Sequence, residues 1–114
     1  MRKLLLFSLT IVLLSACNRK NVKIPTSIIS KDSMMNILMD LHIAEAGVKT
    51  MSADSIALNT KSFYEFTFKK YSVTETRFRE SLFFYTEHPE LLEEIYVKMT
   101  EEMSRKEAEI FKNP

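Results

Sequence analysis

The sequence predicts an all-α fold, a small bundle of about four helices, on three observations. One glycine and three prolines in 114 residues are too few for the turns that strands require. Apolar residues recur every three or four positions through most of the chain after residue 30. Residues typical of helix N-caps or first turns stand where these stretches begin. Short connections between such helices favour a compact bundle.

A short apolar segment lies at the N-terminus. Residues 1–3 give a basic start, and residues 4–14 contain only Ser8 and Thr10 as polar interruptions. Eleven helical residues rise about 16 Å, roughly half of the ~30 Å hydrocarbon core, so the segment is too short to span a bilayer. A basic start followed by a short apolar stretch is typical of a secretory signal.

The apolar segment ends in Leu14-Ser15-Ala16-Cys17, which resembles the bacterial lipobox. This resemblance implies cleavage that removes residues 1–16 as a signal peptide and attachment of lipid, palmitate included, to Cys17. At about 0.8 kcal/mol per buried CH₂, two or three acyl chains make a lasting membrane anchor. The other interpretation is a buried apolar helix with a free thiol. Position, spacing and neighbouring residues favour the lipid.

Residues 17–29 are interpreted as the lipidated cysteine and a flexible basic tether. Arg19, Lys20 and Lys23 have no acidic neighbours, and Pro25 discourages a helix. Two interpretations remain open. The tether contacts anionic headgroups, at about 1 kcal/mol per charge, or it is only a soluble linker.

Residues 30–114 form the expected helical domain. Ser30 is the predicted N-cap of its first helix, and Asp32 in the first turn favours the positive end of the helix dipole. Gly47 or residues 50–52 should end this helix. Ser52 then repeats the same capping chemistry at the start of a second helix.

The second helix is expected to run from residue 53 towards Tyr71. Thr74 is the predicted N-cap of a third helix. Pro89 begins a fourth helix that reaches about Lys112, because proline at the first helical position costs no intrahelical hydrogen bond.

The expected core consists of apolar residues at helical spacing. These are Met34, Ile37, Leu38, Leu41, Ala44 and Val48, then Ile56, Phe63, Tyr64, Phe66, Phe68 and Tyr71, then Phe78, Leu82 and Tyr85, and finally Leu92, Ile95, Tyr96, Met99 and Met103. The nearby Met34, Met35 and Met39 suit either core filling, which is favoured, or an adaptable binding groove. Residues 101–112 are mostly charged and should stand clear of the core.

A polar cluster is the main candidate for chemistry. Asp40, His42 and Glu45 lie within six residues, and His88 is the only other histidine. On a helix Asp40 and His42 point about 160° apart, so they cannot converge on one ion. Zinc takes three or four ligands, whereas His42 and Glu45 provide two. We therefore expect no metal site, no cofactor and no catalytic residue here, and expect His42 or Asp40 to cap or bond a neighbouring helix across the bundle.

Other functional classes are also disfavoured. The sequence has no glycine-rich phosphate loop and no His-Glu-x-x-His motif. Removing Arg2 and Lys3 from the 16 basic residues leaves 14, against 15 acidic residues spread along the chain. This balance gives no basic patch for nucleic acid, and the protein is not expected to be an enzyme.

Residues 29–46 (ISKDSMMNILMDLHIAEA) and 68–99 (FKKYSVTETRFRESLFFYTEHPELLEEIYVKM), together with the lipobox, resemble a family of short uncharacterised lipoproteins of Bacteroidetes, described only as a domain of unknown function. The resemblance covers about residues 25–105. It implies a helical fold and a cell-envelope location but no activity. Surface-exported lipoproteins of that lineage carry an acidic run after the cysteine. The basic residues here imply a protein that faces the periplasm, with the outer membrane favoured over the inner.

Two serines resemble the Asp-Ser-apolar sequon for O-glycosylation in that lineage. They are Ser33, in Asp-Ser-Met, and Ser55, in Asp-Ser-Ile. The capping chemistry of a helix start explains the same residues, so both interpretations remain open.

These features predict a membrane-anchored, non-enzymatic lipoprotein that binds another envelope protein as a scaffold or accessory. The alternative is a carrier or chaperone for an apolar ligand, held in an aromatic interior formed by Phe63, Phe66, Phe78 and Phe84. An enzyme is the least favoured class.

Overall fold

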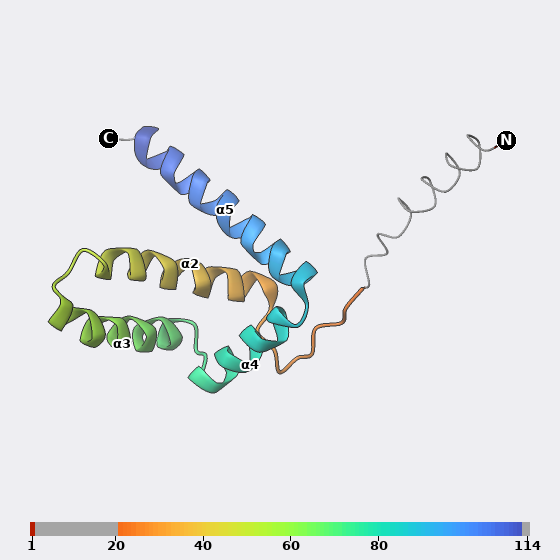
Figure 1. Ribbon diagram of the computed structural model, residues 1–114, viewed down its shortest axis with the longest axis horizontal. Helices are drawn as coiled ribbons and strands as arrows, with labels where there is room; N and C mark the ends of the chain where they lie inside the picture. The colour runs from red at the N-terminus through yellow and green to blue at the C-terminus, as the bar shows by residue number, and fades with distance from the viewer. Residues whose placement is uncertain (2–20, 113–114) are drawn as a thin grey trace.

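The computed structural model describes residue 1 and residues 21–112 of the chain, and those residues form an all-α bundle without strands (Figure 1). The predicted fold class and helix order are confirmed. The helices are α2 (Lys31–Val48), α3 (Ala53–Lys70), α4 (Glu75–Thr86) and α5 (Pro89–Lys112). The lipobox and Cys17 lie outside the described residues.

Side chains at the predicted N-caps begin two of the helices. The Ser30 hydroxyl accepts a hydrogen bond from the backbone N–H of Ser33 at 3.3 Å, and the Thr74 hydroxyl accepts one from that of Arg77 at 3.1 Å. Ser52 is the N-cap of α3, but its hydroxyl pairs with the Ser55 hydroxyl at 3.1 Å instead of a backbone N–H. Local capping chemistry therefore explains where α2 and α4 begin.

The end of α3 is a Schellman motif with a serine at the left-handed position. Ser72 has φ 52°, and its N–H donates to the Lys69 carbonyl at 3.2 Å. The Val73 N–H donates to the Phe68 carbonyl at 2.9 Å. Both bonds satisfy carbonyl groups that the helix end would otherwise leave unpaired, and glycine is the residue that usually occupies this position.

Helix α2 lies in the middle of the bundle, with α3 antiparallel to it on one side and α5 on the other (Figure 1). Helix α4 packs against the start of α5. Because α2 has neighbours on two sides, it buries more of its circumference than a single stripe. Met35 and Met39, which the predicted stripe omits, are 8% and 4% exposed.

Several aromatic residues expected in the core are exposed, and these expectations are wrong. Phe66 is 67% exposed, Tyr96 46% and Phe63 36%. On α5 the buried positions are Leu91, Ile95 and Met99, spaced by four residues, so Tyr96 is turned outwards. On α3 only the side that contacts α2 is covered, because α3 is an outer helix.

The segment before α2 differs from the expected flexible tether. Ile29 is buried, and Val22, Ile24 and Ile28 are partly buried against the same core. Apolar residues at positions 22 and 24 flank the exposed Lys23, and this alternation suits an extended strap with one covered side. Residues 22–29 therefore belong to the packed domain.

Candidate functional site

Asp40 joins the centre of α2 to the end of α3. Its Oδ2 accepts hydrogen bonds from Lys70 Nζ at 2.7 Å and from the Tyr71 hydroxyl at 2.9 Å. The bond to Asp40 raises the pKa of Lys70. Burial, followed by the same carboxylate, raises the pKa of Tyr71. The two hydrogen bonds link the centre of α2 to the end of α3.

Glu45 makes a second contact between α2 and α3. The Tyr64 hydroxyl donates to Glu45 Oε1 at 2.8 Å. Burial raises the pKa of Tyr64, and the hydrogen bond to Glu45 raises it further. Asp40 and Glu45 thus face the same neighbouring helix through separate partners.

The two histidines lie elsewhere. His42 is on α2 with an exposed side chain. His88 is in the connection between α4 and α5, where its Nδ1 lies 2.7 Å from the Phe84 carbonyl and its ring stacks on Phe84 at 4.3 Å. A carbonyl accepts, so Nδ1 carries the proton. The structure does not bring Asp40, His42, Glu45 and His88 to one point.

No group of three histidine, cysteine, aspartate or glutamate side chains among residues 21–112 has the arrangement to hold a metal ion. The structure instead places Asp40 and Glu45 in contacts along the α2–α3 seam and His88 in contact with Phe84 of α4, while His42 is exposed. Their geometry suits structural hydrogen bonds.

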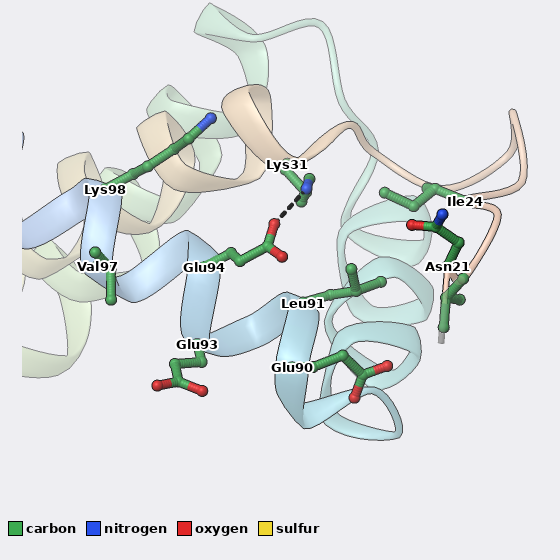
Figure 2. Close-up of a pocket in the computed structure, with 10 residues that line it drawn as sticks. Asn21, Ile24, Lys31, Glu90, Leu91, Glu93, Glu94, Val97 and Lys98 are labelled. Atoms are coloured by element: carbon green, nitrogen blue, oxygen red, sulfur yellow. Dashed lines mark hydrogen bonds and ion pairs between the residues drawn. The ribbon is translucent and has the colours of Figure 1, made fainter. Parts of the chain in front are cut away.

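A hollow of about 570 Å³ lies between the N-terminal segment and the first half of α5 (Figure 2). Ile24 and Leu91 give it apolar lining, and Glu90 and Glu93 lie on its α5 side. Lys31 Nζ is paired with Glu94 Oε2 within it. Sequence reasoning missed this hollow because its two walls are about seventy residues apart in the chain.

A second ion pair stands beside the hollow. Lys98 Nζ lies 3.0 Å from Asp32 Oδ1, and the pairing raises the pKa of Lys98 through the hydrogen bond to Asp32. Lys31–Glu94 and Asp32–Lys98 fix how α5 lies along the first turn of α2. Because each of these charged groups is already paired, neither pair offers a free group to bind a ligand.

The two candidate glycosylation serines lie in the first turns of α2 and α3. Ser33 is exposed, and its hydroxyl accepts from the Ser30 hydroxyl at 3.1 Å. Ser55 is half-buried beside Ser52. Both take part in capping contacts, and their glycosylation stays a prediction.

The C-terminal part of α5 extends past the core, as its charge pattern predicts (Figure 1). Met99 is the last buried residue, and every residue from 104 to 112 is exposed. Ile110 and Phe111 are 69% and 77% exposed. Arg105 holds Glu102 at 2.7 Å and Glu109 at 2.6 Å. Ion pairs along the helix thus take the place of tertiary contacts. We name residues 103–111 the α5 tip.

Comparison with known proteins gives one match. A family model described as a domain of unknown function, DUF4296, matches residues 25–109. No curated protein and no solved structure matches the chain. The match begins before α2, so it includes part of the packed N-terminal segment. None of the described helices is long and apolar enough to cross a membrane.

Proposed function

The chain belongs to the DUF4296 family, and we propose that it is a non-enzymatic lipoprotein of a Bacteroidetes cell envelope that binds another envelope protein. Acyl chains on Cys17 anchor it, with the domain in the periplasm and the outer membrane favoured over the inner. The observation that carries the binding role is the α5 tip, a helix end with exposed Ile110 and Phe111.

The anchor rests on the lipobox-like Leu14-Ser15-Ala16-Cys17 and the short apolar segment before it. Several acyl chains bind a membrane far more strongly than one chain or a basic patch does. The short distance between Cys17 and the packed segment then keeps the domain at the membrane.

The binding role rests on the arrangement of apolar residues at the α5 tip. Single exposed apolar residues are ordinary, but here Ile110 and Phe111 are exposed side by side, and Ile110 lies seven residues after Met103, which packs partly buried against the core. Residues at this spacing lie on one side of a helix. Such a side is what a groove in a partner protein, or a second helix, recognises.

The positions of the aromatic residues favour an adaptor over a carrier for an apolar ligand. Phe63 and Phe66 lie at the surface of α3, while Phe78 packs tightly on Phe68 with ring centroids 5.0 Å apart. These residues do not enclose a shared interior. A structural role of Asp40 and Glu45 also agrees with a non-enzymatic protein, since each already bonds a partner on α3.

Photo-crosslinking in intact cells tests the binding role. A photoreactive amino acid at Ile110 or Phe111 should capture one defined envelope protein, whereas the same group at the exposed Glu80 on α4 should not. Ile110→Ser in the Phe111-labelled protein should abolish the product. Crosslinks only to lipid or to the protein itself would refute the proposal. Retention of the Phe111 product with Ile110→Ser would do so as well.

A further inference from the structure

The chain enters the fold at Ile29, whose backbone is held by two buried side chains of α4. We name Ile29, Ser81 and Tyr85 the clamp. Ile29 is 2% exposed, and its N–H donates to the Ser81 hydroxyl at 2.9 Å. Its carbonyl accepts from the Tyr85 hydroxyl at 2.6 Å. Ser81 and Tyr85 are fully buried one turn apart on α4. Freeing Ile29 would break both hydrogen bonds and leave the buried Ser81 and Tyr85 hydroxyls to find new partners, so this point of the chain is fixed.

Contacts further upstream extend the clamp. Arg77 Nε donates to the Ser27 carbonyl at 3.0 Å, and the Ile28 N–H donates to the Pro25 carbonyl at 3.1 Å. Ile24 and Leu91, in the first turns of α5, line the same hollow (Figure 2). Val22 and Ile24 also pack partly buried against the core, so the segment belongs to the packed domain as far as residue 22.

We infer that the domain sits on the membrane in one orientation, with the corner between α4 and α5 towards the lipid and the α5 tip away from it. This inference rests on the proposed anchor at Cys17. The five residue-to-residue steps from Cys17 to Val22 can span at most about 18 Å. The corner next to Val22 is thus confined to the region close to the membrane.

The length and direction of α5 determine what lies far from the lipid. This helix has 24 residues and is about 36 Å long. It begins beside the N-terminal segment and runs away from it, as does α2 (Figure 1). The α5 tip and the turn between α2 and α3 are accordingly presented to the periplasmic space.

The charges of the corner set how closely it approaches the lipid. Glu87, Glu90 and Glu93 are exposed there. Carboxylates lose hydration when they enter a membrane interface and are repelled by anionic headgroups. The corner therefore rests above the headgroups without inserting, and the lipid anchor supplies the attachment.

Fluorescence quenching on vesicles tests this orientation. The full lipidated chain is prepared with Glu93→Cys or Ile110→Cys, and because acylation occupies Cys17 the added thiol is the only one to label. Vesicles of phosphatidylethanolamine and phosphatidylglycerol carry a quencher on the headgroup. We expect at least threefold stronger quenching at position 93 than at position 110. Equal quenching, or stronger quenching at position 110, would overturn the inference.

Two further variants show whether the clamp causes the orientation. Twenty glycine and serine residues inserted after residue 20 should make the two positions equal, because the domain can then tumble. Ser81→Ala with Tyr85→Phe should reduce the difference while circular dichroism shows the helices intact. A difference that survives the insertion would mean that something other than the clamp orients the domain, and the inference would fail.

Vesicle flotation separates the two proposals. Protein that floats with vesicles but shows no difference between positions 93 and 110 refutes the orientation and leaves the anchor standing. Protein that does not float, compared with a Cys17→Ser control, refutes the anchor and the orientation together. The partner bound by the α5 tip is tested independently by crosslinking.

Discussion

Ile29 and Phe111 lie near opposite ends of the described chain, and their surroundings differ. Ile29 is enclosed by α4, and both of its backbone polar groups bond to buried side chains. Phe111 is 77% exposed on a helix end supported mainly by ion pairs along the same helix. Buried contacts thus hold the chain where it enters the fold at Ile29, whereas the α5 tip is exposed. This contrast agrees with the proposed role, in which the chain is held at one end and binds a partner at the other.

Tyr85→Ala should produce the largest effect. Tyr85 is fully buried, so its loss opens a cavity and also removes the donor to the Ile29 carbonyl. We expect a loss of about 3–5 kcal/mol in the free energy of unfolding, measured by urea denaturation of the lipid-free domain. Phe111→Ala is the control from the other region, with an expected change within about 0.5 kcal/mol. Similar losses in the free energy of unfolding for the two variants would contradict the contrast between the clamp and the α5 tip.

Ser81→Ala isolates one hydrogen bond of the clamp. The alanine fills nearly the same space but leaves the buried Ile29 N–H without its acceptor. The expected loss is about 1–3 kcal/mol in the free energy of unfolding. Ser62→Ala is a matched control, because its exposed hydroxyl donates only to the Leu58 carbonyl within α3. A loss at Ser62 as large as that at Ser81 would show that burial of the clamp is not the cause.

Ser72→Gly should change stability in the opposite direction by a smaller amount. Ser72 adopts φ 52°, a left-handed conformation that glycine reaches without a steric clash because it has no Cβ. We expect a gain of up to about 1 kcal/mol, measured by the same denaturation. Ser72→Val should lower stability, since a β-branched residue suits this conformation least. A gain with valine would contradict the explanation.

The contrast between the two regions also explains what the sequence could predict. Ser30 and Thr74 mark helix starts through bonds to residues three positions later, and Pro89 marks one through its fixed φ, so a single sequence shows these local signals. The clamp joins Ile29 to Ser81 and Tyr85, which lie 52 and 56 positions further along the chain. No local pattern in the sequence indicates that pairing. The sequence therefore predicts a flexible tether where the structure has a packed strap at residues 22–29.

The rotation of helices was the other feature that the sequence left open. A broad apolar surface on α3 or α5 permits several orientations, and the contacts with α2 select one. That selection buries Leu91 and exposes Tyr96. The polar cluster was partly predictable: Asp40 bonds a neighbouring helix as expected, while His42 faces solvent because α3 and α5 do not cover it.

Acidification should act on the α5 tip with the smallest effect. The hydrogen bond from Arg105 lowers the pKa of Glu102 below its ordinary value. A carboxyl group whose pKa is lower in the folded state stabilises that state above the unfolded pKa, about 4.5, and this contribution is lost as the pH falls through the folded pKa. Between pH 6 and pH 3 the end of α5 should therefore fray while the clamp persists.

Hydrogen exchange can resolve this difference residue by residue. After correction for the intrinsic rates, amides in residues 104–112 should exchange about twofold faster relative to Ile29 at pH 3 than at pH 6. Arg105→Gln should give the faster relative exchange already at pH 6, and Arg79→Gln, which removes the pair with Glu75 on α4, should leave the α5 tip unchanged. If Ile29 and the tip lost protection together, the two regions would unfold as one unit, and the helix end could not adapt to the proposed partner while the clamp stays folded.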